Sequence, residues 1–179
     1  MGQTGMKKLV EDLKSLAGRS FPVEETGAFL TGVRLEPGAL EAIATFREDR
    51  YARHRIYRDA DFELLVLCWK SGQWAPIHGH EGQRCWARVE RGRLRFTEYR
   101  EVSEDPVRLE QVGDPLIGEV GFIDSPENLH RVENLVEFGE DVITLHLYAH
   151  PYDECDVYES PTGPKHRKPL ICDSVQSEI

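Results

Sequence analysis

A pair of histidines separated by one residue is the most chemically suggestive feature of this 179-residue sequence. His78 and His80 follow Pro76-Ile77 and form a His-x-His pair. Residues i and i+2 of an extended segment point to the same face, so both imidazoles can reach one ion. Imidazole binds iron, zinc, copper and nickel, so the pair predicts a metal site. A further histidine, His130, opens the string His-Arg-Val-Glu-Asn later in the chain.

The cysteines favour free thiols over a disulfide framework. Cys68, Cys85, Cys155 and Cys172 lie 17, 70 and 17 residues apart, which excludes the CxxC pair of a zinc ribbon or a thioredoxin-like site. The N-terminal residues lack the apolar core of a secretory signal. We therefore expect reduced thiols and a cytoplasmic location.

The charge balance narrows the possible partners. The chain has 22 Lys and Arg against 32 Asp and Glu, a formal net charge of −10. An acidic chain lacks the basic footprint of a nucleic-acid binder and is poorly suited to anionic lipid. A composition of 40% hydrophobic and 30% charged residues is typical of a globular protein. We expect a protein that binds neither nucleic acid nor membrane.

The elements that position these residues are predicted to be short helices followed by many strands. Residues 6–17 place apolar side chains at helical spacing before Gly18, and a second helix is predicted from about Pro37 to Arg50. After Tyr51, turn-rich segments separate strand-like runs at Phe62–Trp69, Cys85–Arg91, Leu94–Arg100, Glu119–Asp124 and Asp141–Tyr148. This pattern predicts an all-β sandwich or small barrel. The apolar run 62–69 predicts a strand that is buried on both faces.

The frame around the histidines resembles the two motifs of the cupin superfamily, a small β-barrel of jelly-roll type. The resemblance implies that His78, His80 and His130 are metal ligands. Cys85 stands where the common cupin motif has a ligating Glu, and in this the chain resembles the thiol dioxygenases, the cysteine dioxygenases in particular. Those proteins hold Fe(II) with three histidines. The matching stretches are Tyr51-Ala52-Arg53, Leu67-Cys68-Trp69, Pro76-Ile77-His78-Gly79-His80, His130-Arg131-Val132-Glu133-Asn134, Leu145-His146-Leu147-Tyr148 and Pro151-Tyr152-Asp153-Glu154-Cys155.

The resemblance also implies a role for individual residues. Cys85 and Tyr148 match a pair that forms a thioether cross-link in the family. Arg53 and Tyr51 match the residues that bind the substrate carboxylate, and His146 matches a histidine that hydrogen-bonds the tyrosine. The remaining matches are Thr144 in the same network, Trp69 in the pocket wall and Cys155 near the pocket mouth.

The implied activity is the Fe(II)-dependent oxidation of L-cysteine by O2 to cysteine sulfinic acid. Three neutral imidazoles leave the ion its full charge, and a thiol that coordinates such an ion is deprotonated. Arg53 offers a planar donor fork to a carboxylate, which is costly to bury unpaired. The implied architecture is one cupin domain, 1–179, with a helical segment 1–50, a barrel core 51–158 and a tail 159–179. Closed barrels leave few exposed edges, so we expect a monomer.

Other interpretations stay open at the level of sequence. Cys85 also fits an inert buried thiol, and His146 and Tyr148 also fit interior packing. Arg53 lies in a basic cluster that is equally typical of a solvated face, with Arg47, Arg50, Arg55 and Arg58. An alternative substrate is 3-mercaptopropionate or another small thiol. An alternative of a different class is a metal-binding cupin without catalytic activity.

Overall fold

A computed structural model describes residues 3–124 and 129–176 of the chain. Two helices, α1 (Met6–Ala17) and α2 (Val23–Gly32), come first, and one short 3-10 helix, Val136–Phe138, lies among the strands. The strands are β1 (Ala52–Arg58), β2 (Phe62–Trp69), β3 (Trp74–His78), β4 (Arg84–Arg91), β5 (Leu94–Glu104), β6 (Val107–Gln111), β7 (Leu116–Gly118), β8 (Ile123–Asp124), β9 (Leu129–Glu133), β10 (Val142–Ala149), β11 (Glu154–Tyr158), β12 (Lys165–Pro169) and β13 (Ser174–Val175).

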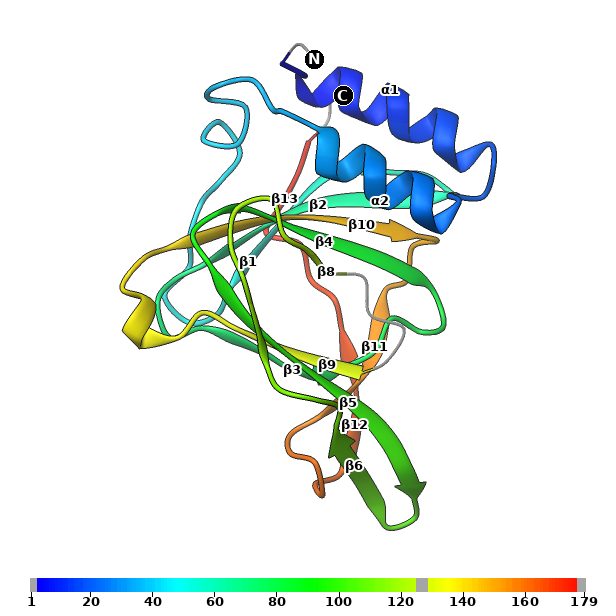
Figure 1. Ribbon diagram of the computed structural model, residues 1–179, viewed down its shortest axis with the longest axis vertical. Coiled ribbons are helices and arrows are strands. Elements are labelled where there is room, and N and C mark those ends of the chain that lie inside the picture. Colours follow the sequence, from blue (N-terminus) through cyan, green and yellow to red (C-terminus); the bar gives the residue numbers. More distant parts are fainter. Residues whose placement is uncertain (1–2, 125–128, 177–179) are drawn as a thin grey trace.

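The strands form two sheets that face one another (Figure 1). The first sheet has the order β13-β1-β2-β10-β4-β8, and the second has the order β12-β11-β3-β9-β5-β6, with β7 paired to β5. Strands that are distant in sequence, such as β2 and β10 or β3 and β9, are neighbours, as in a jelly roll. The predicted fold class is therefore confirmed. The sheets are not closed into one barrel, and the monomer expected from a closed barrel stays a prediction.

Successive side chains of β2 and β10 point to opposite faces of the first sheet, so these strands contribute to two separate hydrophobic cores. Both helices cover the outer face of the first sheet (Figure 1), where α1 buries Leu9 and Leu13 against Leu64 and Leu145. The opposite face of the same strands contributes to a second cluster between the sheets, which includes Leu65, Leu67, Trp69, Val132, Val142 and Tyr148. Every residue of β2 is buried, as its apolar run predicted. The side chains of the candidate site project into this inner layer.

The predicted first helix is confirmed, but the predicted second helix is wrong. Residues 37–43 form turns, residues 44–50 are not helical, and the second helix is α2 instead. Gly38 has φ of 82°, which interrupts a right-handed helix just after Pro37. Leu40 and Ile43 nevertheless pack against the outer core, so the apolar spacing identified a buried segment but not its backbone.

Two further differences concern strand boundaries. The predicted strand Glu119–Asp124 is reduced to β8, because a turn with Gly121 at φ 91° separates it from β7. The tail 159–179, in which no strand was predicted, contributes β12 to the second sheet and β13 to the first. Its backbone thereby reaches the strand that carries Arg53, since the Asp173 N–H donates to the Arg53 carbonyl at 2.7 Å.

Within the described ranges, no helix is both long enough and apolar enough to cross a bilayer.

Candidate metal centre and adjoining cavity

Three histidines converge between the sheets. His78 ends β3 and His130 lies directly opposite it on β9, while His80 follows on the loop after β3. One ring nitrogen from each histidine lies within 4.8 Å of the other two. The ring centroids are 4.7–5.5 Å apart. The one-residue spacing of the His-x-His pair and one cross-strand pairing therefore bring together the three residues predicted to bind a metal.

Hydrogen bonds fix the orientation of two of these rings. His78 Nδ1 donates to the Pro76 carbonyl at 2.8 Å, and His130 Nδ1 donates to the Asp124 carboxylate at 2.8 Å. Each bond places the ring proton on Nδ1 and leaves the Nε2 lone pair free. A carboxylate behind a ligating histidine is a common feature of metal sites because it fixes the ring and raises its basicity. Asp124 was not predicted from the sequence.

The donor set fits a divalent transition metal. Burial, followed by electrostatic repulsion from the adjacent His130, lowers the pKa of His78 to about 3. Burial likewise lowers the pKa of His80, so both rings are neutral, which is the form that binds metal. His130 Nε2 is buried and has no hydrogen-bond partner among the described residues. Such a buried nitrogen is costly unless something binds it, so Fe(II) or a related ion fits here.

A chain of hydrogen bonds leads from the core to Tyr148. Trp69 Nε1 donates to Thr144 Oγ1 at 2.9 Å, and that oxygen lies 2.9 Å from His146 Nε2. His146 Nδ1 lies 3.3 Å from the Tyr148 hydroxyl oxygen. Burial, followed by the charge of a nearby arginine, lowers the pKa of His146, so its ring carries one proton. With the Thr144 hydroxyl donating to Nε2, Nδ1–H donates to Tyr148 and leaves the phenol proton free to donate into the cavity.

Cys85 and Tyr148 are direct cross-strand neighbours. They lie opposite one another on β4 and β10. Side chains at such positions have Cβ atoms ~4.5–5.5 Å apart. Burial raises the pKa of the Cys85 thiol well above its usual value, and a hydrogen bond with Tyr148 opposes that shift. The thiol is therefore neutral, and it lies beside the phenol as the implied cross-link requires.

A cavity of about 160 Å³ adjoins the histidines and contains Arg53. His78, Tyr51, Tyr148 and Cys155 also line it. Arg53 is 6% exposed, and its Nε has no partner among the described residues. The guanidinium stays charged, because arginine does not lose its proton in proteins. A buried cation that faces a cavity is suited to binding an anion.

The C-terminal tail holds the Arg53 backbone in place. The Asp173 carboxylate accepts the Arg53 backbone N–H at 2.9 Å and a hydrogen bond from Arg50 at 2.7 Å. Burial acts to raise the pKa of Asp173, but these hydrogen bonds outweigh it and lower the pKa. The pairing spans 120 residues and had no signal in the sequence.

Two aromatic residues stand differently from what sequence reasoning suggested. Trp69 is buried one layer behind the cavity and stacks on Tyr51 with ring centroids 4.3 Å apart. It supports Tyr51 and the hydrogen-bond chain, while Tyr51 itself faces the cavity. Tyr152, to which no role was assigned, lines the cavity and packs edge-on against Tyr148 at 5.3 Å. Its position within the Pro-Tyr-Asp-Glu-Cys stretch was the available signal.

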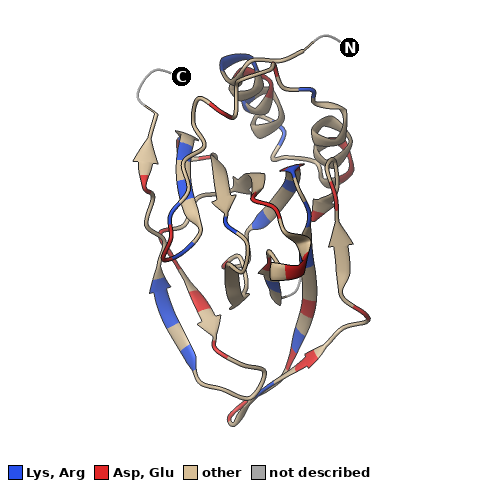
Figure 2. Ribbon diagram, turned by 90° about the vertical axis from the view of Figure 1, so that its left-hand side faces the viewer, with Lys and Arg blue, Asp and Glu red and all other residues tan. Residues whose placement is uncertain are grey.

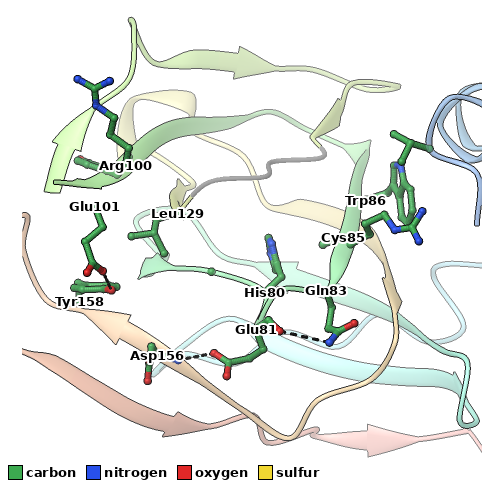
Figure 3. Close-up of a pocket in the computed structure, with 15 residues that line it drawn as sticks. His80, Glu81, Gln83, Cys85, Trp86, Arg100, Glu101, Leu129, Asp156 and Tyr158 are labelled. Atoms are coloured by element: carbon green, nitrogen blue, oxygen red, sulfur yellow. Dashed lines mark hydrogen bonds between the residues drawn. The ribbon is translucent and has the colours of Figure 1, made fainter. Parts of the chain in front are cut away.

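A second cavity, of about 470 Å³, adjoins His80 (Figure 3). His80 and Cys85 line it, together with three carboxylate residues: Glu81, Glu101 and Asp156. Figure 3 shows the Glu81 side chain pointing away from the His80 ring, toward Asp156. Arg84 and Arg100 line this cavity beside the carboxylates, so its lining carries both signs of charge, whereas the described lining of the smaller cavity contains the buried Arg53 and no acidic residue. The smaller cavity is therefore the better site for a small carboxylate.

Known proteins share features of this chain. The model of the family described as Cysteine dioxygenase type I matches residues 4–161. Cysteine dioxygenase type 1 of Bos taurus is 29% identical over 154 residues, which cover 84% of this chain and 76% of the relative. The Rattus norvegicus protein of that name is 30% identical over the same shares. Among solved structures, an rmlc-like cupin protein from Desulfovibrio desulfuricans has a TM-score of 0.44 and 19% identity, over 66% of this chain and all of that one.

Proposed function

The chain belongs to the cysteine dioxygenase type I family, and on this basis we propose that it is an Fe(II)-dependent dioxygenase that oxidises L-cysteine to cysteine sulfinic acid. The family match supports a dioxygenase. One observation carries the choice of substrate: His78 of the histidine cluster and the buried cation of Arg53 line the same small cavity. A ligand with its thiol at the histidines and its carboxylate at Arg53 is a small thiol acid. We place the activity in the cytoplasm, in keeping with four free cysteines.

The three histidines would hold the iron, which when bound would supply coordination of the thiol and reactivity toward O2. Arg53 would bind the substrate carboxylate through its planar donor fork, and Tyr51 would add a hydroxyl donor. Tyr148, held by His146, would donate its phenol proton to the reacting end of the substrate. The thiol supplies all four electrons that reduce O2, so no reducing cosubstrate is required.

Removal of single residues separates the iron site from the carboxylate site. His130→Ala should abolish stoichiometric Fe(II) binding, while the exposed His166→Ala serves as a matched control and should retain it. Arg53→Ala should keep its iron and lose most of its affinity for cysteine, measured by anaerobic calorimetry. Full iron content in the first variant would remove His130 from the ligand set. Unchanged cysteine affinity in the Arg53 variant would refute the carboxylate assignment.

We further propose that Cys85 and Tyr148 form a thioether. The bond would join Cys85 Sγ to the ring carbon beside the phenol oxygen, and its formation would remove two hydrogen atoms to O2. Intact protein after turnover should therefore be lighter by two hydrogens than its sequence mass. Cys85→Gly should lack this deficit and keep partial activity. An uncrosslinked peptide pair after extended turnover, seen by mass spectrometry, would contradict the proposal.

The cavity gives a second candidate substrate some support. None of its described lining residues is acidic, so the structure offers no carboxylate to the amine of cysteine. A thiol acid without an amine, such as 3-mercaptopropionate, could bind Arg53 and Tyr51 through its carboxylate in the same way. Side-by-side turnover of the two thiols distinguishes these candidates. A higher kcat/KM for 3-mercaptopropionate than for cysteine would support the same oxidation reaction with 3-mercaptopropionate as the preferred substrate.

A further inference from the structure

Lys168 stands at the mouth of the cavity that contains Arg53. It lies on β12 directly opposite Cys155 on β11. Directly opposite residues project to the same face of a sheet, and Cys155 lines the cavity, so the Lys168 stem is directed to the same side. Lys168 is itself part of the cavity lining and is exposed. A long exposed side chain with an apolar stem can hold its ammonium group at such an opening.

The cavity continues outward past this residue. A groove of about 790 Å³ shares with the cavity the residues Arg50, Trp74, Pro76, Val157 and Lys168. Arg53, His78 and Tyr148 line only the inner space, so Lys168 marks the passage from the inner cavity to the groove. A ligand held at Arg53 would extend toward Lys168.

The charge of Lys168 is uncompensated. On β12, Lys165 pairs with Glu104 at 3.3 Å and Arg167 pairs with Glu81 at 2.5 Å. Figure 2 shows blue segments on β12 and red segments on the neighbouring β11. Lys168 makes no ion pair with any residue in the described ranges. At the mouth, Arg50 is already paired with Asp173, so Lys168 is the basic residue there that is free to bind an anion.

We propose that Lys168 forms a second anion-binding position in this pocket, so that the pocket favours thiols with two carboxylates over thiols with one. The proposal rests on the proposed function, because it assigns Arg53 to the first carboxylate. Lys168 acts on ligand affinity and has no part in holding the metal. The ligand class is a small dicarboxylic thiol whose second carboxylate stops at Lys168, because the groove beyond is also lined by Glu48, Asp49 and Glu159.

The test compares two thiols that differ by one carboxylate: 3-mercaptopropionate and mercaptosuccinate. Binding to the Fe(II)-loaded full chain is measured by calorimetry without O2, so that no turnover is needed. The wild type should bind mercaptosuccinate more tightly. Lys168→Gln should weaken mercaptosuccinate binding by about three- to fivefold at low ionic strength, as for an exposed ion pair, and leave 3-mercaptopropionate within about twofold. Lys168→Arg should retain the preference.

Lys165→Gln is the matched control, because Lys165 is on the same strand but outside both cavities. It should change neither affinity. Equal weakening of both thiols by Lys168→Gln, or no change in either, would overturn the proposal while leaving the pocket assignment intact. Failure of the wild type to bind either thiol would overturn both this proposal and the proposed function. Added salt should shrink the difference between the two thiols, since the ion pair is exposed.

Discussion

Two arginines on one strand should respond to the same substitution with opposite changes in stability. Arg53 and Arg55 are two residues apart on β1 and so share a face of the sheet. Arg53 is buried with no carboxylate partner among the described residues. Arg55 donates to the Glu63 carboxylate at 2.6 Å, and Glu63 is 3% exposed. Methionine at either position keeps much of the side-chain volume and removes the charge.

The expected change in the free energy of unfolding depends on whether each substitution leaves a buried charged group without its partner. Arg53→Met removes a buried charge and leaves no buried partner unpaired, so we expect a gain of about 1–2 kcal/mol. Arg55→Met leaves the Glu63 carboxylate buried with only Arg58, at 3.7 Å, so we expect a loss of about 1–3 kcal/mol. In a domain of this size each kcal/mol moves Tm by about 2–4 °C. The first variant should melt about 2–8 °C higher than wild type, and the second should melt lower.

The assay is thermal unfolding of the metal-free protein without thiol, combined with calorimetric cysteine binding to the Fe(II)-loaded form. Arg53→Met should combine a raised Tm with a loss of cysteine affinity. A raised Tm together with a lost cysteine affinity would indicate that Arg53 serves substrate binding while it destabilises the fold. A lowered Tm for Arg53→Met would refute the view that this cation is unpaired. Wild-type cysteine affinity in the same variant would refute its assignment to the carboxylate.

Three further predictions address the support of the site. Asp124→Asn should weaken Fe(II) affinity about 10- to 100-fold in a chelator competition, because it replaces the carboxylate behind His130; wild-type affinity would contradict that role. Thr144→Val should destabilise the fold by about 1–3 kcal/mol in urea unfolding, because the buried Trp69 N–H loses its acceptor; unchanged stability would mean that this bond is dispensable. The pKa of Asp173 is lowered in the folded state, so its contribution is complete above pH ~4 and declines as the pH falls through the folded-state pKa. The stability difference between wild type and Asp173→Asn should therefore be constant near neutrality and shrink in acid, and a difference independent of pH would contradict the assignment.

The parts of this molecule that short-range patterns encode could be predicted from the sequence. The His-x-His spacing keeps two imidazoles close enough to reach one ion, although His80 lies just past the end of β3. The apolar run of β2 requires burial on both sides. Helix α1 has its apolar residues at helical spacing and a glycine at its end. The segment after Pro37 has similar apolar spacing, but Gly38 adopts a positive φ and the backbone turns. The apolar periodicity of this segment identified its buried side chains, but it did not reveal that the backbone turns instead of forming a helix.

The parts that depend on long-range pairing could not be predicted. Asp124 reaches His130 because β8 joins the edge of the first sheet while β9 lies in the second, and no local spacing encodes that. Asp173 and Lys168 reach the cavity through tail strands whose sequence is polar and irregular. Resemblance to the cupin motifs supplied the roles of residues in the centre of the pocket. The resemblance assigned no role to any residue of the tail 159–179, which carries Lys168 and Asp173.

Oxygen uptake by the Fe(II)-loaded protein with L-cysteine distinguishes a thiol dioxygenase from a metal-binding cupin without this activity. We expect one O2 to be consumed per thiol and a product heavier than cysteine by the mass of both oxygen atoms, with no added reductant. The protein without iron serves as the control and should consume none. No uptake with cysteine or 3-mercaptopropionate, with iron verified in the protein, would refute the proposed activity and favour the metal-binding cupin.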